Sequence, residues 1–188
     1  MGFWDALRGR TTPKRANLDA LFAVPSAAIT LEAAAGLTPT GLGAVCFRAA
    51  EGAAFAQTQA DVVALIDADG ETPPVEEITD GFGFTWLVCR NDDLAALCTD
   101  LHAVNTSLQA QGFGTGLLCS VVPFAGPDGR RVGVVYLYKR GTFYPFAPQE
   151  GERRDNLLEL QVRDLLDGEL PIEADLQRWL AVWGAPGL

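Results

Sequence analysis

A chain of 188 residues is long enough for a domain with a substantial core, and 48% apolar with 20% charged residues is typical of a globular protein. The net charge of −10 is uneven, because residues 1–15 hold four basic side chains against Asp5 and carry +3. An acidic body without a basic stripe repels phosphate backbones, so nucleic acid is excluded as a partner.

The apolar runs, the amino-terminal residues and the cysteines indicate in which cellular compartment the protein resides. No apolar run reaches the ~20 residues of a membrane span, and residues 1–10 lack the apolar core and cleavage site of a secretory signal. We therefore expect a soluble cytoplasmic protein with four free thiols. Residues 1–16 are predicted to be a flexible or amphipathic amino-terminal segment, and residues 17–188 a single α+β domain.

The domain is predicted to begin with a helix. Asn17 can cap a short helix, which Pro25 should interrupt. Ser26 then restarts a helix that ends near Gly36. A strand is expected over residues 41–49, a turn at 51–52 and a return strand over 53–59.

The next stretch is less regular. Residues 61–67 suit either a short helix or a strand. Residues 69–80, with two prolines and many acids, favour an exposed loop, and residues 82–90 favour a third strand.

The most clearly specified helix is expected over residues 92–111. Asn91 or Asp92 can cap it, and apolar side chains at spacings of three or four form one stripe. A hairpin should follow, with strands over 116–124 and 131–139 and a turn at 126–129. Residues 142–146 are predicted to extend the sheet at an edge, where Pro145 is tolerated.

Two helices are expected to close the chain, one up to Gly168 and one from Pro171 to about Gly184. The predicted order is α-β-β-β-α-β-β-α-α. This order favours an α+β fold with an antiparallel sheet of five to six strands and packed helices. It is similar to type III secretion chaperone-like domains.

The hairpin strands carry apolar side chains on both faces, so both faces of the sheet need cover. The chain's own helices can supply it, with the carboxy-terminal pair reaching around the sheet. Alternatively, one face is a partner or homodimer interface. The aromatic residues predicted for such an interface are Tyr136, Tyr138, Phe143, Tyr144, Trp179 and Trp183.

Residues that could carry chemistry are sparse. His102 is the only histidine, and no motif supplies it with a nucleophile. The cysteines lack metal-ligand spacing, and residues 112–116 join a helix to a strand, the reverse of a phosphate loop. We predict no catalytic activity, no cofactor and no metal. An alternative is a small-ligand pocket or an enzyme site near Tyr136, Tyr138, Phe143, Tyr144 and Phe146.

The amino terminus suggests a contact with lipid or a partner. Phe3, Trp4 and Leu7 are followed by basic residues, as in a short interfacial helix. Membrane contact would be weak and reversible, since the acidic body opposes anionic lipid. Such contact would place the protein peripherally at the inner face of the membrane. The alternative is a frayed end or a segment packed on the domain.

Six segments spanning the chain resemble the PspA-associated protein PspAB family of bacteria. They are residues 1–10 (MGFWDALRGR), 17–26 (NLDALFAVPS), 82–90 (FGFTWLVCR), 100–114 (DLHAVNTSLQAQGFG), 135–148 (VYLYKRGTFYPFAP) and 176–188 (LQRWLAVWGAPGL). The resemblance implies association with PspA, a peripheral membrane protein of the envelope-stress response, and genes near an HtpX-type membrane protease. It implies no site residues.

The leading hypothesis is thus a non-catalytic adaptor or regulatory protein of a PspA/HtpX-type envelope-stress system, acting through protein contacts. One alternative is a chaperone-like module that holds a client segment on the apolar sheet face. Another is a small-ligand-binding protein or an enzyme of unknown class.

Overall fold

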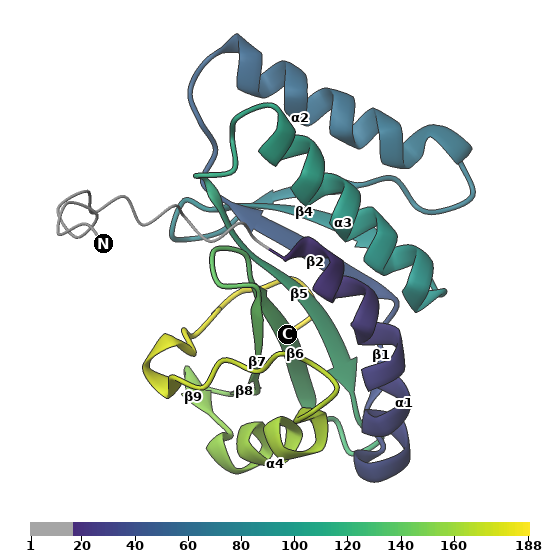
Figure 1. The fold of residues 1–188 in the computed structure, drawn as a ribbon, viewed down its shortest axis with the longest axis vertical. Coiled ribbons are helices and arrows are strands. Elements are labelled where there is room, and N and C mark those ends of the chain that lie inside the picture. The colour runs from purple at the N-terminus through teal and green to yellow at the C-terminus, as the bar shows by residue number, and fades with distance from the viewer. Residues whose placement is uncertain (1–16) are drawn as a thin grey trace, which may run out of the picture.

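The computed structural model describes residues 17–188 and has an α+β fold built on a mostly antiparallel sheet (Figure 1). The contacts predicted for Phe3, Trp4 and Leu7 lie outside the described residues. The main sheet has the strand order β3-β4-β2-β5-β6-β7. Its strands are β2 (Leu42–Phe47), β3 (Glu76–Thr79), β4 (Thr85–Arg90), β5 (Leu117–Ala125), β6 (Arg131–Leu137) and β7 (Thr142–Phe146).

Three shorter strands complete the pairing. The two-residue β1 (Thr38–Pro39) pairs with the end of β5, and β8 (Pro148–Gln149) pairs with β9 (Arg153–Arg154) in a separate ribbon. The strand β3 lies in the stretch predicted as an exposed loop. It pairs with β4 at the sheet edge, where only one of its residues, Ile78, is partly buried.

The first helix differs from the prediction at Pro25. A 3-10 helix, η1 (Leu18–Ala23), runs directly into α1 (Val24–Ala35), and Pro25 lies in the first turn of α1. Proline is tolerated there because the first amides of a helix have no intrahelical partner. The helix ends at Gly36, whose φ of 64° is readily adopted by glycine.

The helical stretch Leu18–Ala35 is long and apolar enough, by length and composition alone, to cross a membrane. The search for an uninterrupted apolar run did not find this stretch, because Asp19 and Glu32 interrupt it. Its mean hydropathy nevertheless stays high. Its inner side chains pack in the core of the fold; they include Leu18, Leu21, Val24, Ala27, Ala28 and Leu31.

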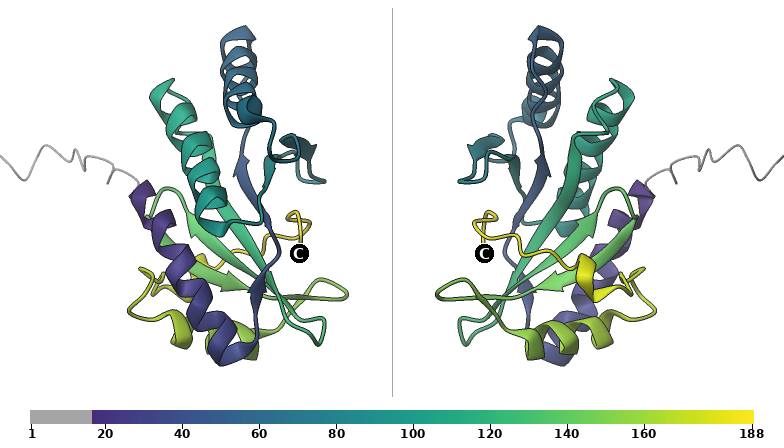
Figure 2. Two further views of the ribbon diagram at one scale, coloured as in Figure 1. Left: turned by 90° about the vertical axis from the view of Figure 1, so that its right-hand side faces the viewer. Right: turned by 90° about the vertical axis from the view of Figure 1, so that its left-hand side faces the viewer.

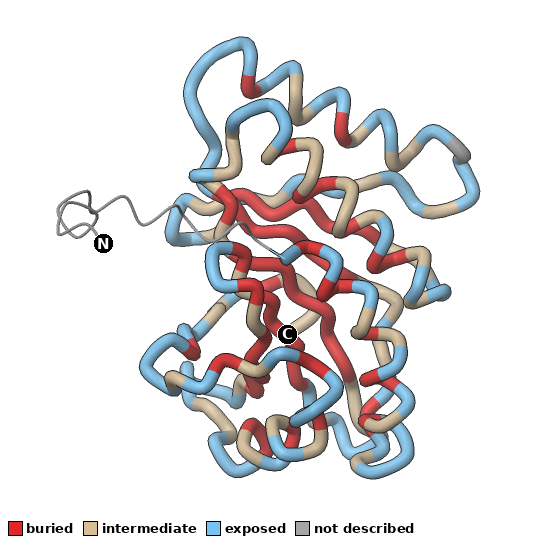
Figure 3. Tube along the Cα trace, viewed as in Figure 1, coloured by how far each residue is buried: buried red, intermediate tan, exposed pale blue. Residues whose placement is uncertain are grey.

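The return strand predicted over residues 53–59 is wrong, because these residues begin the helix α2 (Ala53–Ile66). The ambiguous residues 61–67 continue it, and a 3-10 turn, η2 (Asp67–Asp69), follows. The only buried residues of α2 are Phe55 and Val62, which are seven residues apart and share one helical face. Alanine-rich sequence favours a helix once this narrow face packs on α3. The rest of α2 is largely exposed (Figure 3).

The central helix α3 (Leu94–Ala110) closely matches its prediction. Its cap is Asp93, not the predicted Asn91 or Asp92, and the Asp93 carboxylate accepts hydrogen bonds from the amides of Ala95 and Ala96. Its apolar stripe is buried against the sheet. The helix α4 (Asn156–Leu166) packs on the same face, with Asp155 as its cap.

The second closing helix is also wrong. Residues 171–188, named the strap below, contain only the 3-10 turn η3 (Leu176–Arg178) and otherwise run as an irregular, extended chain. The strap lies along the sheet, and its side chains pack on strands instead of forming a helical stripe. Counted over the four helices and the six strands of the main sheet path, the observed order is therefore α-β-α-β-β-α-β-β-β-α. A helix replaces the predicted second strand, β3 is added, β7 is the predicted edge extension, and the last predicted helix is absent.

The sheet separates two hydrophobic cores (Figure 2). On the helix face, α1, α3 and α4 cover side chains such as Val45, Leu87 and Tyr136. On the strap face, the strap covers side chains such as Cys46, Trp86 and Tyr144. Both faces are apolar, as the hairpin pattern predicted, and the chain itself supplies most of the cover.

Candidate functional site

An apolar cleft with a volume of about 600 Å³ opens on the strap face, between one end of the sheet and residues 180–183 of the strap. Its lining is almost entirely apolar, unlike that of the other hollows in the described part of the chain. The lining residues are Cys46, Asp80, Phe82, Phe84, Trp86, Leu118, Cys119, Leu137, Lys139, Arg140, Tyr144, Leu180, Ala181, Val182 and Trp183.

The floor of the apolar cleft follows from strand alternation and register. Cys46 on β2 lies opposite Trp86 on β4 and opposite Cys119 on β5. Beyond Cys119 the register shifts, so that Phe47 faces Leu117 and Leu118 is left without an opposite residue. This bulge leaves Leu117 in the helix-face core and brings Leu118 to the apolar cleft.

The strap is fixed over the floor by specific bonds. The Tyr144 hydroxyl donates to the Leu180 carbonyl at 2.8 Å, and its ring stacks on Trp179 at 6.0 Å between centroids. The indole N–H of Trp179 donates to the Glu173 carbonyl at 2.9 Å. These contacts hold residues 180–183 as one wall of the apolar cleft.

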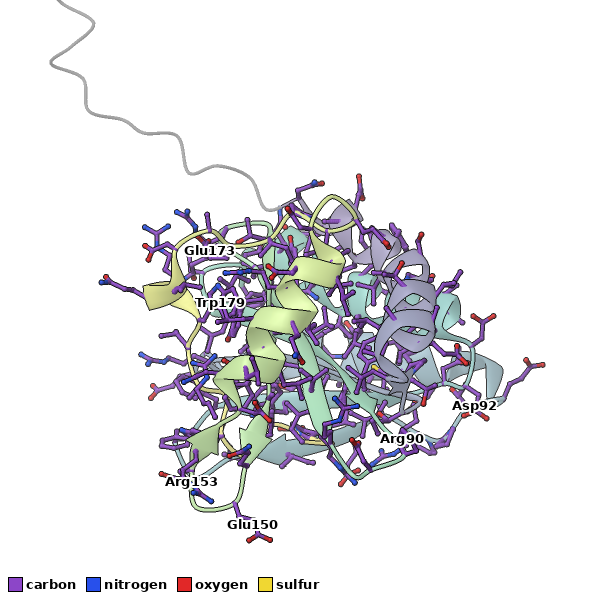
Figure 4. The ribbon with its side chains drawn as sticks, turned by 90° about the horizontal axis from the view of Figure 1, so that it is seen from below. Arg90, Asp92, Glu150, Arg153, Glu173 and Trp179 are labelled. Atoms are coloured by element: carbon purple, nitrogen blue, oxygen red, sulfur yellow. The ribbon has the colours of Figure 1, made fainter. Side chains whose placement is uncertain are left out.

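Glu173 anchors the start of the strap beside β7, close to Trp179 (Figure 4). Its carboxylate is only 3% exposed and accepts from the Arg140 guanidinium at 3.1 Å, the Thr142 hydroxyl at 3.0 Å and the Asp175 amide at 3.1 Å. Burial acts to raise the pKa of Glu173, but these donors outweigh it and leave the pKa lowered. The anchor therefore works with an ionised glutamate.

Asp80 forms the polar corner of the apolar cleft. Its carboxylate accepts from the Trp86 indole N–H and from the amides of Phe82 and Phe84, each at 2.9 Å. Burial favours a raised pKa for Asp80, but these hydrogen bonds lower it overall. The bonds order the loop that carries Phe82 and Phe84 along the edge of the cleft.

The Cys46 thiol on the floor is protonated at neutral pH. The pKa of Cys46 is raised, first by the hydrogen bond between its thiol and that of Cys119 and then by burial. Burial also raises the pKa of Cys89 and of Cys98 to about 12. Reactive cysteines need a lowered pKa, so these side chains behave as small apolar groups.

The mouth of the apolar cleft exposes large apolar side chains. Phe82 is 65% exposed and Leu180 is 63% exposed, on opposite sides of the opening. Trp183 lies partly buried beside them. Clustered exposed apolar side chains next to a hollow are typical of a binding surface.

Basic side chains surround this mouth although the chain is acidic overall. Lys139 and Arg140 line it, and the Arg48 guanidinium lies 5.7 Å from the centroid of the Phe84 ring. Arg140 is paired with Glu173. Within residues 17–188, neither Arg48 nor Lys139 has a carboxylate at ion-pair distance.

The six aromatic residues predicted for an interface do not form one surface. Tyr136, Tyr138 and Phe143 are buried in the helix-face core. Tyr144 is buried under the strap, and Trp179 is a buried side chain of the strap itself. Of the six, only Trp183 is partly exposed, and it lines the apolar cleft together with Tyr144. Contact of these two with a partner stays a prediction.

Sequence reasoning missed Phe82, Phe84, Trp86 and Leu180. A signal was present for the first three, because aromatic residues at alternate positions project from the same face of an extended chain. Nothing in the sequence indicated that this face would meet the strap. Leu180 was assigned to a helix, which concealed its position at the cleft mouth.

His102 lies in a separate, polar hollow with Asn17, Asp19, Thr106 and Gln109. Its Nε2 is 3.3 Å from the exposed Asp19 carboxylate, and its ring lies 4.8 Å from that of Phe22. The Thr106 hydroxyl donates to backbone carbonyls, including that of His102, so it is turned away from the imidazole. Across residues 17–188, no group of three or more His, Cys, Asp or Glu side chains is placed to hold a metal ion.

Fold and site together define an antiparallel α+β protein with one strap-walled apolar cleft, a form suited to binding an apolar group. A family model described as PspAB, PspA associated protein B, matches residues 1–187, and the chain belongs to that family. No curated protein and no solved structure matches it.

Proposed function

We propose that the protein is a non-catalytic adaptor or regulatory protein of a PspA/HtpX-type envelope-stress system that binds a PspA-type protein. The family description, which associates it with PspA, supports this partner. The HtpX-type protease and the envelope-stress setting rest on the family resemblance. The proposed location is the cytoplasm, at the inner face of the membrane when residues 1–10, with Phe3, Trp4 and Leu7, contact lipid.

The single observation that carries the proposal is the apolar cleft with its exposed mouth. Phe82 is 65% exposed and Leu180 is 63% exposed, so burying both under a partner would contribute roughly 2–4 kcal/mol. The flanking contacts of the partner must supply the rest of the free energy that offsets the cost of association. The hydrogen bonds of Tyr144 and Trp86 hold the walls in place, so little ordering is needed on this side.

A chaperone-like function, in which an extended client lies along the sheet, has less support. Most of the strap face is already buried by the strap itself; for example, Val88, Val121 and Val135 are fully buried. The remaining opening suits a few side chains. The likeness to type III secretion chaperones therefore stays a prediction.

A small-ligand function has one specific observation in its favour. The volume of about 600 Å³ lies in the range of small-molecule sites. Such sites normally add several convergent polar groups that orient a substrate. Here the main polar side chain on the edge, Asp80, is already fully engaged by Trp86 and two amides.

The test is binding of the purified full-length chain to the PspA-type protein of the same organism, measured by calorimetry or interferometry. Leu180→Asp and Phe82→Asp should each weaken the complex at least tenfold, because each places a charge at the apolar mouth. Leu157→Asp is the matched control, since Leu157 is 69% exposed on α4 and does not line the cleft.

Absence of binding by the unaltered chain, or an equal loss with Leu157→Asp, would count against the proposal. Deleting residues 1–10 separates their contribution to partner or vesicle binding from that of the cleft. Solution mass determines whether a homodimer, the other predicted occupant of an apolar surface, forms.

A further inference from the structure

We infer that the partner presents an acidic amphipathic segment, whose bulky apolar side chains enter the apolar cleft while its carboxylates face Arg48 and Lys139. This inference rests on the proposed function and specifies the chemistry of the segment that the site accepts. Three observations lead to it: the hydrogen bonds inside the cleft, the charges at its mouth, and the charge of residues 1–15.

The group that enters the cleft must be apolar, because the polar atoms of the lining, apart from Lys139 at the mouth, are engaged within the chain. The Trp86 N–H donates to Asp80, and the Tyr144 O–H donates to the Leu180 carbonyl. The thiols of Cys46 and Cys119 on the floor share a hydrogen bond. A polar group inserted there would lose its hydration without gaining a partner. Phenylalanine and leucine side chains, or the apolar part of a tryptophan ring, would lose no hydrogen bond to water.

The groups flanking the inserted side chains should be anionic. Arg48 follows β2 by one residue and lies over the ring of the partly buried Phe84. Lys139 follows β6 by two residues and is part of the cleft lining. Neither is neutralised by an ion pair within residues 17–188, while Arg140 and Asp80 are both engaged. A carboxylate above Arg48 or Lys139 would meet an available cation on a chain whose net charge of −10 repels anions elsewhere.

The same charges disfavour the chain's own amino-terminal segment as the occupant. Residue 17, where the described part of the chain begins, lies against Gly141, next to Lys139 and Arg140. Sixteen preceding residues could reach the cleft in length, at roughly 3.3–3.6 Å per extended residue. Residues 1–15 nevertheless carry +3 and would meet the unpaired cations at the mouth.

The test uses a random-peptide library displayed on phage and the purified full-length chain, so it does not depend on PspA. Peptides are selected on the unaltered chain and counter-selected on Leu180→Asp. We expect the enriched sequences to combine large apolar residues with Asp or Glu. Their affinity should fall at least tenfold on Arg48→Glu/Lys139→Glu and should weaken as salt is raised.

Arg153→Glu/Arg163→Glu is the control, with an equal charge change at the exposed Arg153 and the partly buried Arg163, neither of which lines the cleft. Enrichment of basic or uncharged peptides, or of no cleft-dependent peptide, overturns the inference. The inference is also overturned if dodecanoate binds while no cleft-dependent peptide is found. The ligand would then be an anionic amphiphile and not a protein segment.

The two proposals fail separately. Acidic peptides that bind the cleft while a PspA-type protein does not would remove the proposed partner and keep the inferred chemistry. A PspA-type protein that binds through Leu180 but ignores the Arg48→Glu/Lys139→Glu change would remove the inferred chemistry and keep the partner.

Discussion

The two faces of the sheet are equally apolar but are covered in different ways. On the helix face, α1, α3 and α4 present ridges of side chains that leave residues such as Leu31, Leu97 and Leu101 with no exposed surface. On the strap face, a single extended chain covers the strands. This cover buries Val121 and Val135 but leaves the apolar cleft beside Trp86.

The difference teaches how one sheet can combine stability with binding. A helix covers a strip about 10 Å wide and packs side chains from every turn. An extended strap covers a narrower strip, and its free backbone groups need specific partners such as Tyr144 and Arg154. The helix face should therefore control global stability, and the strap face should control local opening and binding.

The largest expected effect is on the helix face, with Leu101→Ala. Leu101 is fully buried and packs on Gly43, where an added Cβ would come within 2.9 Å of Leu101 Cδ1. We expect the free energy of unfolding to fall by about 3–4 kcal/mol, since lost contacts and a cavity add together. Urea denaturation measures it, and a loss below about 1 kcal/mol would show that the helix face does not control stability.

The next effect is on the strap, with Trp179→Ala. A buried tryptophan normally costs about 3–5 kcal/mol when truncated, but the strap can detach without opening the sheet, so we expect a global loss of about 2 kcal/mol. Hydrogen exchange should accelerate in residues 174–188 and remain slow in β2 and β5. Equal acceleration in the strap and the central strands would contradict the separation of the two faces.

A smaller loss of stability is expected when the pH is lowered. Because the pKa of Glu173 is lowered from 4.5 by folding, its stabilisation is complete above about pH 4.5 and is lost as pH falls through the folded value. Asp80 adds a similar loss below its ordinary 3.8. Tryptophan fluorescence between pH 7 and pH 3 should report strap loosening before global unfolding.

Glu173→Gln provides the control for the acid prediction. It should cost about 1 kcal/mol at pH 7, because the ion pair between Arg140 and the carboxylate becomes a hydrogen bond from Arg140 to a neutral amide. It should also remove the part of the acid response due to Glu173, while Asp80 and Asp128, whose pKa is lowered too, retain theirs. An unchanged acid profile would mean that Glu173 does not anchor the strap.

The smallest effect on stability is expected at the cleft mouth. Phe82→Ser and Leu180→Ser change side chains that are mostly exposed, so each should alter the free energy of unfolding by no more than about 0.5 kcal/mol. Thermal denaturation checks this. A large loss would mean that these side chains support the fold and would remove their value as probes of binding.

The sequence by itself determined the α+β class, the central helix and the hairpin. Their signals are local: an apolar stripe at helical spacing in α3, and turn residues between two strands with apolar faces. The cap itself is Asp93 and not the predicted Asn91 or Asp92. The need for cover on both sheet faces followed as well, because side-chain alternation is a property of each strand alone.

Only the tertiary structure decided the rest. Residues 53–59 form a helix because Phe55 and Val62 find α3, and residues 179–183 stay extended because Tyr144 and Glu173 bind their backbone and Trp179. The apolar cleft depends further on a bulge at Leu118 and on an Asp80 bond to Trp86. These contacts join residues that are distant along the chain or depend on strand register, so no local pattern encodes them.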